Sequence, residues 1–171
     1  MEDEKSLLNE VSAEGYDAAV RPFDFVAEGG ETALVCEPDQ AVREKISGAL
    51  RPLNYQTTEP ASAKEALRYM RFHVYDLVVL NERFDTEDPQ SNGVLLYLAN
   101  MAAVTRRKIF VVLVSGQHRT LDNMAAFNRS VNLIINLKSI DEAGNIIKQG
   151  VSENADFYHV FRETLQKMGK S

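Results

Sequence analysis

Apolar and polar positions alternate along most of this chain in a way typical of strands and helices in turn. Five short segments have the composition of buried strands, at residues 33–36, 55–58, 76–80, 109–114 and 133–137. Amphipathic patterns with helical spacing separate or follow them, at residues 40–50, 63–71, 93–101, 120–127 and 152–168. The alternation predicts an α/β fold, a doubly wound five-stranded parallel sheet with helices on both faces.

Capping residues mark the N-termini of two predicted helices. Asp39 and Ser62 stand where N-caps are expected, and Glu65 completes a capping-box pattern with Ser62. Residues 141–149 indicate one or two helical turns, and Ser152 is expected to start a separate last helix. The apolar stripe of this helix predicts that it is anchored to the sheet by aromatic residues, namely Phe157, Tyr158 and Phe161, with Tyr158 left partly available to a partner.

The acidic charge of the chain is concentrated at its N-terminus. Residues 1–31 hold nine acids and two bases, whereas residues 32–171 carry 16 acids and 17 bases. We expect residues 1–30 to be an acidic extension or linker, with a short edge strand at 22–26, and residues 31–171 to form the α/β domain. The near-neutral domain argues against a general nucleic-acid surface.

Composition also indicates the environment of the protein. No apolar run approaches the length of a membrane span, and the acidic start lacks the features of a signal peptide. Cys36 is the only cysteine, which excludes an intramolecular disulfide. We therefore expect a cytoplasmic protein that does not associate with membranes.

Candidate chemistry lies at the carboxyl ends of the predicted strands, where open parallel sheets bind their ligands. These positions are occupied by Glu37, Asp39, Asn81, Ser115 and Lys138. The chain has neither a G-x-G-x-x-G motif nor a P-loop, and its histidines lack metal-ligand spacing. We expect no cofactor and no bound metal.

With this order of elements, the chain over residues 32–168 resembles the receiver domain of response regulators. Ser115, Gly116 and Lys138 match the hydroxyl residue, the small residue and the lysine that surround the phosphoryl group in that family. The resemblance implies a phosphorylation switch. At the position of the family's phosphoryl-accepting aspartate, however, this chain has Asn81.

Further departures from the family fall on the same site. Glu37 matches the first acid after the first strand, but Pro38 replaces the second, and Asp39 is expected to cap a helix rather than to act as a displaced ligand. Magnesium prefers anionic oxygen ligands, and an amide is not a useful nucleophile. Ile135 occupies a position where receivers often have a switching aromatic residue. We therefore expect a degenerate site without enzymatic activity, in which Asn81 donates to Glu37 and Lys138 pairs with Glu37 or Asn81.

The sequence favours a pseudo-receiver, a signalling domain that acts through protein contacts. The resemblance implies a partner or homodimer surface formed by residues 118–130, the fifth strand and residues 153–168. Two alternatives remain: an atypical phosphoryl acceptor that uses Asp85 or Asp39, and a flavodoxin-like small-molecule binder that uses the crevice at the strand ends.

Overall fold

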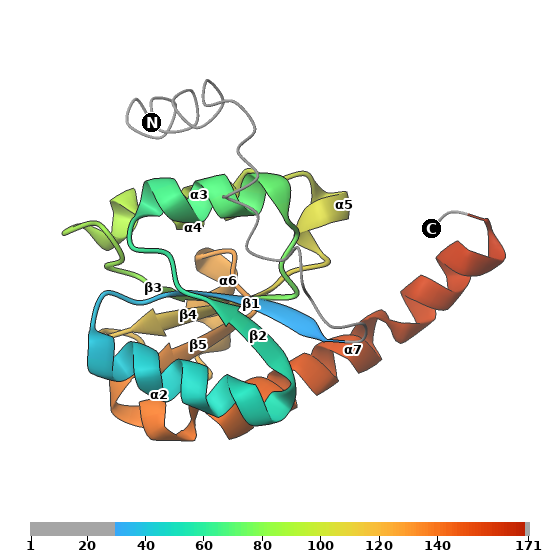
Figure 1. Cartoon of the computed structure of the whole chain (residues 1–171). Helices are drawn as coiled ribbons and strands as arrows, with labels where there is room; N and C mark the ends of the chain where they lie inside the picture. The colour runs from blue at the N-terminus through green and yellow to red at the C-terminus, as the bar shows by residue number, and fades with distance from the viewer. Residues whose placement is uncertain (1–29, 170–171) are drawn as a thin grey trace.

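The computed structural model describes residues 30–169, and it contains the predicted five-stranded sheet. The strands are β1 (Glu31–Cys36), β2 (Tyr55–Thr58), β3 (Leu77–Asn81), β4 (Phe110–Ser115) and β5 (Leu133–Asn136). All neighbouring pairs are parallel and the order is β2-β1-β3-β4-β5, as Figure 1 shows. The predicted fold class is confirmed, whereas the edge strand expected at 22–26 lies outside the described residues.

Six α-helices are described within residues 30–169, and three short 3₁₀ helices lie between the larger elements. The α-helices are α2 (Gln40–Leu50), α3 (Ala63–Phe72), α4 (Gly93–Ala99), α5 (Ala103–Arg106), α6 (Asn123–Asn128) and α7 (Ala143–Lys167). The 3₁₀ helices are η2 (Arg51–Leu53), η3 (Pro89–Ser91) and η4 (Leu137–Glu142). None of the helices in this part of the chain is long and apolar enough to cross a bilayer.

Side chains at helix N-termini explain where several helices begin. The Asp39 carboxylate accepts a hydrogen bond from the Val42 N–H, and the Ser62 hydroxyl accepts one from the Glu65 N–H. The Glu65 carboxylate accepts in turn from the Ala61 N–H, so both predicted caps are formed. A cap that was not predicted, Asn92, begins α4 by accepting from the Leu95 N–H.

Helices cover both faces of the sheet. Alternate strand residues point to two separate cores, and α2 and α7 pack on one face while α3, α4 and α6 pack on the other. Strands β3 and β4 are buried along their whole length, as expected for central strands covered on both sides. The predicted inert thiol, Cys36, is fully buried in one of these cores, and burial raises its pKa well above the usual range.

The last helix differs from the prediction, because residues 143–167 form one continuous helix. The sequence predicted one or two helical turns at 141–149 and a separate helix after Ser152, with Gly150 between them. In the structure Gly150 lies under the ring of Phe110, and a Cβ added there would be 3.1 Å from Phe110 Cζ. A glycine in a helix costs about 1 kcal/mol relative to alanine, but its missing side chain lets α7 lie close to the sheet. Packing therefore favours a helix through Gly150.

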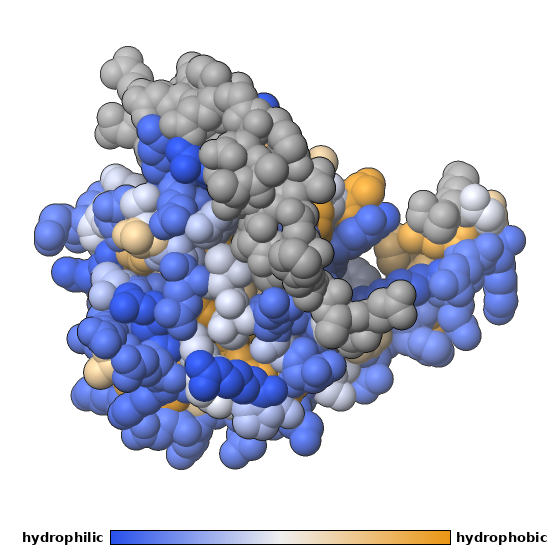
Figure 2. Space-filling model, viewed as in Figure 1, coloured by the Kyte–Doolittle hydropathy of each residue, from blue (hydrophilic) through white to orange (hydrophobic). Residues whose placement is uncertain are grey.

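The second half of α7 extends away from the sheet (Figure 1). Gly150 is beside Phe110, the first residue of β4, so the residues that follow pass the N-terminal edge of the strands. Phe157 is 78% exposed and Phe161 is 40% exposed. The prediction that both anchor the helix to the sheet is wrong. Hydrophobic groups instead gather on the side of this projecting segment that faces the domain (Figure 2).

Candidate functional site

Glu37 and Asn81 lie side by side at the carboxyl edge of the sheet. The order of the strands reverses between β1 and β3, and this switch point is where doubly wound sheets form their ligand crevice. Cys36 and Leu80 are paired in the register of β1 and β3, so the next residue on each strand meets its counterpart. The sheet register thus brings together two residues that are 44 positions apart in the sequence.

The Asn81 side chain is held at both ends. Its Nδ2 donates to Glu37 Oε2 at 2.8 Å, as predicted, and its Oδ1 accepts from the Arg83 N–H at 2.9 Å. With both groups engaged and only 8% of the residue exposed, the amide has one orientation available. The site presents an amide whose nitrogen is already used as a donor.

Glu37 is 1% exposed, and its carboxylate is satisfied without a cation. Oε1 accepts from the Asp39 N–H at 3.0 Å, and Oε2 accepts from Asn81. Burial raises the pKa of Glu37 above its ordinary value, and these two hydrogen bonds oppose the shift. The Arg43 guanidinium donates to the Glu37 carbonyl oxygen, and its Nε lies 3.4 Å from Glu59 Oε2.

Asp39 and Asp85, the two alternative phosphoryl acceptors, both accept hydrogen bonds at helix N-termini. Asp39 caps α2, in agreement with the prediction. Asp85 accepts from the Ala63 N–H at 2.9 Å, at the start of α3, and adopts a positive φ of 54°. Within residues 30–169, neither carboxylate is hydrogen-bonded to the side chain of Asn81 or Glu37. Within residues 30–169, no three His, Cys, Asp or Glu side chains come together as a metal site.

Ser115, at the end of β4, is fully buried. Its Oγ accepts from the Gln117 and His118 N–H groups, both at 3.0 Å, so the hydroxyl shapes the loop after the strand. The following amide, Gly116 N–H, donates to Glu82 Oε1 at 3.0 Å. The backbone amide that follows Ser115 is therefore occupied by a carboxylate of this chain.

Lys138 does not join the cluster as expected. Its backbone N–H donates to Asn136 Oδ1, and its side chain is exposed. In the described part of the chain its ammonium makes no hydrogen bond or ion pair with Glu37 or Asn81, so the predicted pairing is wrong. Asn136 ends β5 by accepting from the Lys138 N–H and donating to the His118 carbonyl, and this turns the lysine outward. Ile135 is fully buried in the core, as an aliphatic residue there predicts.

Sequence reasoning missed two buried residues of the site, Asn92 and Glu82. Asn92 Nδ2 donates to the carbonyl oxygens of Asn81 and Glu82, at 3.1 and 3.0 Å, while its Oδ1 caps α4. Glu82 is 2% exposed, and its Oε2 has no hydrogen-bond partner among the described residues. An asparagine directly before a helical pattern is a signal for a cap, but nothing in the sequence indicates that Glu82 turns inward.

Comparison with known proteins supports the fold. No protein-family model and no curated protein matches the chain. Among solved structures, the chain is similar to a Francisella response regulator receiver domain, with 20% identity and a TM-score of 0.57 over 72% of this chain and 98% of the other. A CheY-like receiver domain protein from Methanospirillum hungatei is 17% identical, with a TM-score of 0.55 over 74% of this chain and 98% of the other.

A third match covers more of this chain but less of its counterpart. NtrX from Brucella abortus, in complex with ADP, is 17% identical with a TM-score of 0.61 over 83% of this chain, which spans only 30% of the NtrX chain. At these identities the matches establish the fold. The chain has the same fold as these receiver domains, a five-stranded parallel sheet in the order β2-β1-β3-β4-β5.

Proposed function

We propose that this protein is a pseudo-receiver, a signalling domain that does not accept a phosphoryl group and acts through protein contacts. The observation that carries the proposal is the arrangement at Asn81. Its amide nitrogen donates to Glu37, and the amide of Gly116 is already occupied by Glu82. Phosphoryl transfer needs a nucleophile and a positioned cation, and Asn81 with Pro38 provides neither.

The first test is phosphorylation itself. We expect no stoichiometric phosphoryl adduct when the full chain is incubated with acetyl phosphate and magnesium and its intact mass is measured. A receiver domain with an acceptor aspartate, treated in the same reaction, is the positive control. An adduct on Asp85 or Asp39 would instead establish the atypical acceptor, and an adduct on any residue would contradict the proposal.

Two variants separate the effect of the missing nucleophile from that of the missing magnesium ligand. Asn81→Asp restores the carboxylate alone, and we expect it to leave magnesium binding weak because Pro38 still occupies the position of a ligand. The double variant Pro38→Asp, Asn81→Asp is expected to bind magnesium more tightly than either single variant. Pro38 is exposed, so its replacement tests the site without disturbing the core.

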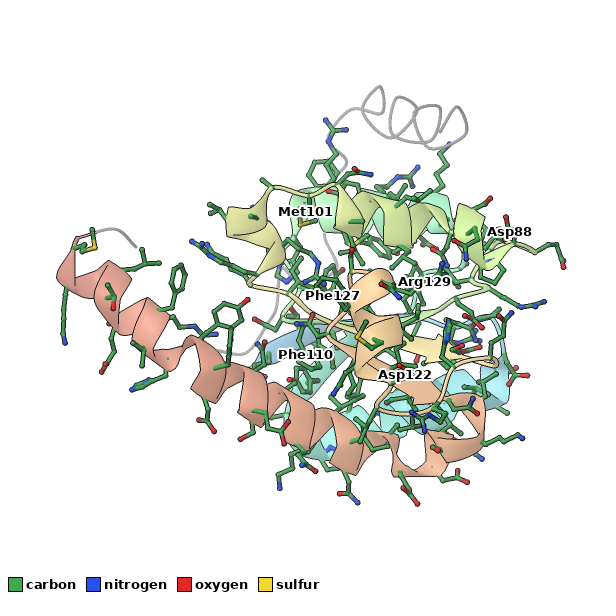
Figure 3. The ribbon with its side chains drawn as sticks, turned by 180° about the vertical axis from the view of Figure 1, so that it is seen from behind. Asp88, Met101, Phe110, Asp122, Phe127 and Arg129 are labelled. Carbon is green, nitrogen blue, oxygen red and sulfur yellow. The ribbon has the colours of Figure 1, made fainter. Side chains whose placement is uncertain are left out.

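Exposed apolar residues on α6, just before α6 and on α7 support a protein contact. They are Leu121, Met124, Phe127 and Phe157, here named the α6–α7 patch, and between 56% and 79% of each residue is exposed. Leu121 and Phe157 line the same groove, of about 460 Å³. Figure 3 shows Phe127 on α6. Large contiguous patches of exposed apolar side chains mark interaction surfaces.

A second copy of the chain is the occupant that we propose for this patch. Charged residues of both signs surround it, among them Arg119, Asp122 and Glu153, so the same surface on a second copy would be complementary to it. We expect the full chain to sediment as a dimer, and Met124→Ser with Phe127→Ser to sediment as a monomer.

A matched variant outside the α6–α7 patch controls for the general effect of removing an exposed apolar side chain. Val104→Ser on α5 removes a residue that is 57% exposed, away from the patch, and is expected to leave the dimer intact. A wild-type chain that stays monomeric at all protein concentrations would overturn the dimer while leaving the phosphorylation result unaffected.

A further inference from the structure

A second hollow lies between the projecting half of α7 and the turn that leads into β4. It has a volume of about 240 Å³, and the residues that line it include Arg107, Lys108, Tyr158, Phe161, Arg162 and Leu165, here named the basic groove. Its walls are aromatic and aliphatic, and its ionisable members apart from Tyr158 are three bases. This combination suits a ligand with apolar side chains and negative charge.

One wall of the groove is the turn formed by residues 106–108. The Arg106 guanidinium donates to the carbonyl oxygens of Ile109 and Ser130, at 2.8 and 2.9 Å. Arg107 Cζ lies 4.9 Å from the centre of the Phe161 ring, a cation–π contact. The cation–π contact joins the turn before β4 to the projecting half of α7, while the Arg106 hydrogen bonds hold the turn itself.

The N-terminal residues of the same chain have the matching chemistry. Residues 1–29 carry eight acids and two bases. Their last third contains Pro22-Phe23-Asp24-Phe25-Val26, which places two aromatic side chains on either side of a carboxylate. Aromatic side chains would contact Tyr158 and Leu165, and the carboxylates would lie near Lys108 and Arg162.

The chain enters the domain at the edge of the sheet where the groove lies. Register pairs Ala33 with Leu77 and Leu77 with Phe110, so Glu31 is level with Lys108. Only β3 separates β1 from β4, a distance of roughly 10 Å. The six Cα–Cα steps from Phe25 to Glu31 can span about 20 Å, which is sufficient to reach the groove.

We propose that residues 22–28 dock in the basic groove of their own domain. The docked segment would cover the apolar side of the projecting α7 and neutralise the bases of the turn before β4. This contact concerns a different surface from the α6–α7 patch, and it does not depend on whether the chain forms dimers.

Zero-length carbodiimide cross-linking of the full chain tests the proposal, because it joins a carboxylate to a lysine amine only when the two are in contact. We expect mass spectrometry to find Lys108 linked to Asp24 or Glu28, with a yield that does not change on dilution. Lys148, an exposed lysine near the start of α7, should give no such link. Yields that rise with protein concentration, or equal linking of Lys108 and Lys148, would overturn the proposal.

Two pairs of variants separate docking from simple charge attraction. Phe23→Ser with Phe25→Ser is expected to lower the Lys108 link by about fivefold or more, because it removes the apolar part of the contact. Leu7→Ser with Leu8→Ser, in the same acidic segment, should leave it unchanged. Arg162→Glu is expected to lower the link and Lys148→Glu to preserve it. A yield that is unaffected by the phenylalanine variant would contradict docking in the groove.

Discussion

Replacing Asn92 by alanine is expected to lower the free energy of unfolding by about 3–4 kcal/mol. Asn92 is fully buried and makes three hydrogen bonds, one to the N-terminus of α4 and two to the carbonyl oxygens of Asn81 and Glu82. Alanine would leave the Glu82 carbonyl oxygen and the Leu95 N–H without this partner, whereas the Asn81 carbonyl oxygen would keep its hydrogen bond from the Phe84 N–H. Each such group costs about 1–3 kcal/mol when water cannot reach it.

The measurement is urea unfolding followed by far-UV circular dichroism, with Asn100→Ala as the matched control. Asn100 is at the other end of the same helix, where it is exposed and its Nδ2 donates to the Leu96 carbonyl. We expect that control to change the free energy of unfolding by less than about 0.5 kcal/mol. Equal effects of the two variants would show that Asn92 does not support the end of β3.

Substitutions in the two halves of α7 are expected to change the free energy of unfolding by very different amounts. Ile147 is fully buried between α7 and the sheet, and Ile147→Ala should destabilise the domain by about 3–4 kcal/mol through a lost side chain and a residual cavity. Phe157 is on the same helix but 78% exposed. Phe157→Ala should change the free energy of unfolding by no more than about 0.5 kcal/mol.

Chemical denaturation of both variants distinguishes this structure from the arrangement that the apolar stripe predicted. If Phe157 anchored the last helix to the sheet, its removal would cost as much as that of Ile147. A large loss of stability in dilute Phe157→Ala, where chains are monomeric, would therefore contradict the projecting helix. A loss that appears only at high protein concentration would instead reflect the proposed contact between copies.

Most of the sheet could be predicted because its signals are local. Continuous apolar runs marked β3 and β4 as central strands, and Asp39 and Ser62 marked the starts of α2 and α3. The last helix could not be predicted in the same way. Gly150 weakens a helix when judged alone, and only its position under Phe110 shows why the helix continues.

The residues of the candidate site were likewise predicted only in part. Glu37, Asn81 and Ser115 were identified because strand ends meet at one edge of a parallel sheet, and the pairing of Glu37 with Asn81 was predicted from their hydrogen-bonding groups. Lys138 was misplaced because the direction of its side chain depends on the bonds of Asn136. Glu82 was missed because burial of a carboxylate has no sequence pattern.

The order of residues alone was enough to predict the α/β class, the strands and the asparagine in place of an acceptor, since each depends on local composition or on a single position. Tertiary structure decided which polar groups form hydrogen bonds with one another. It directs Glu82 to the Gly116 amide, turns Lys138 outward and leaves the apolar side of α7 beyond the sheet. These outcomes depend on distances between residues far apart in the chain, and such distances exist only once the strands have paired and the helices have packed.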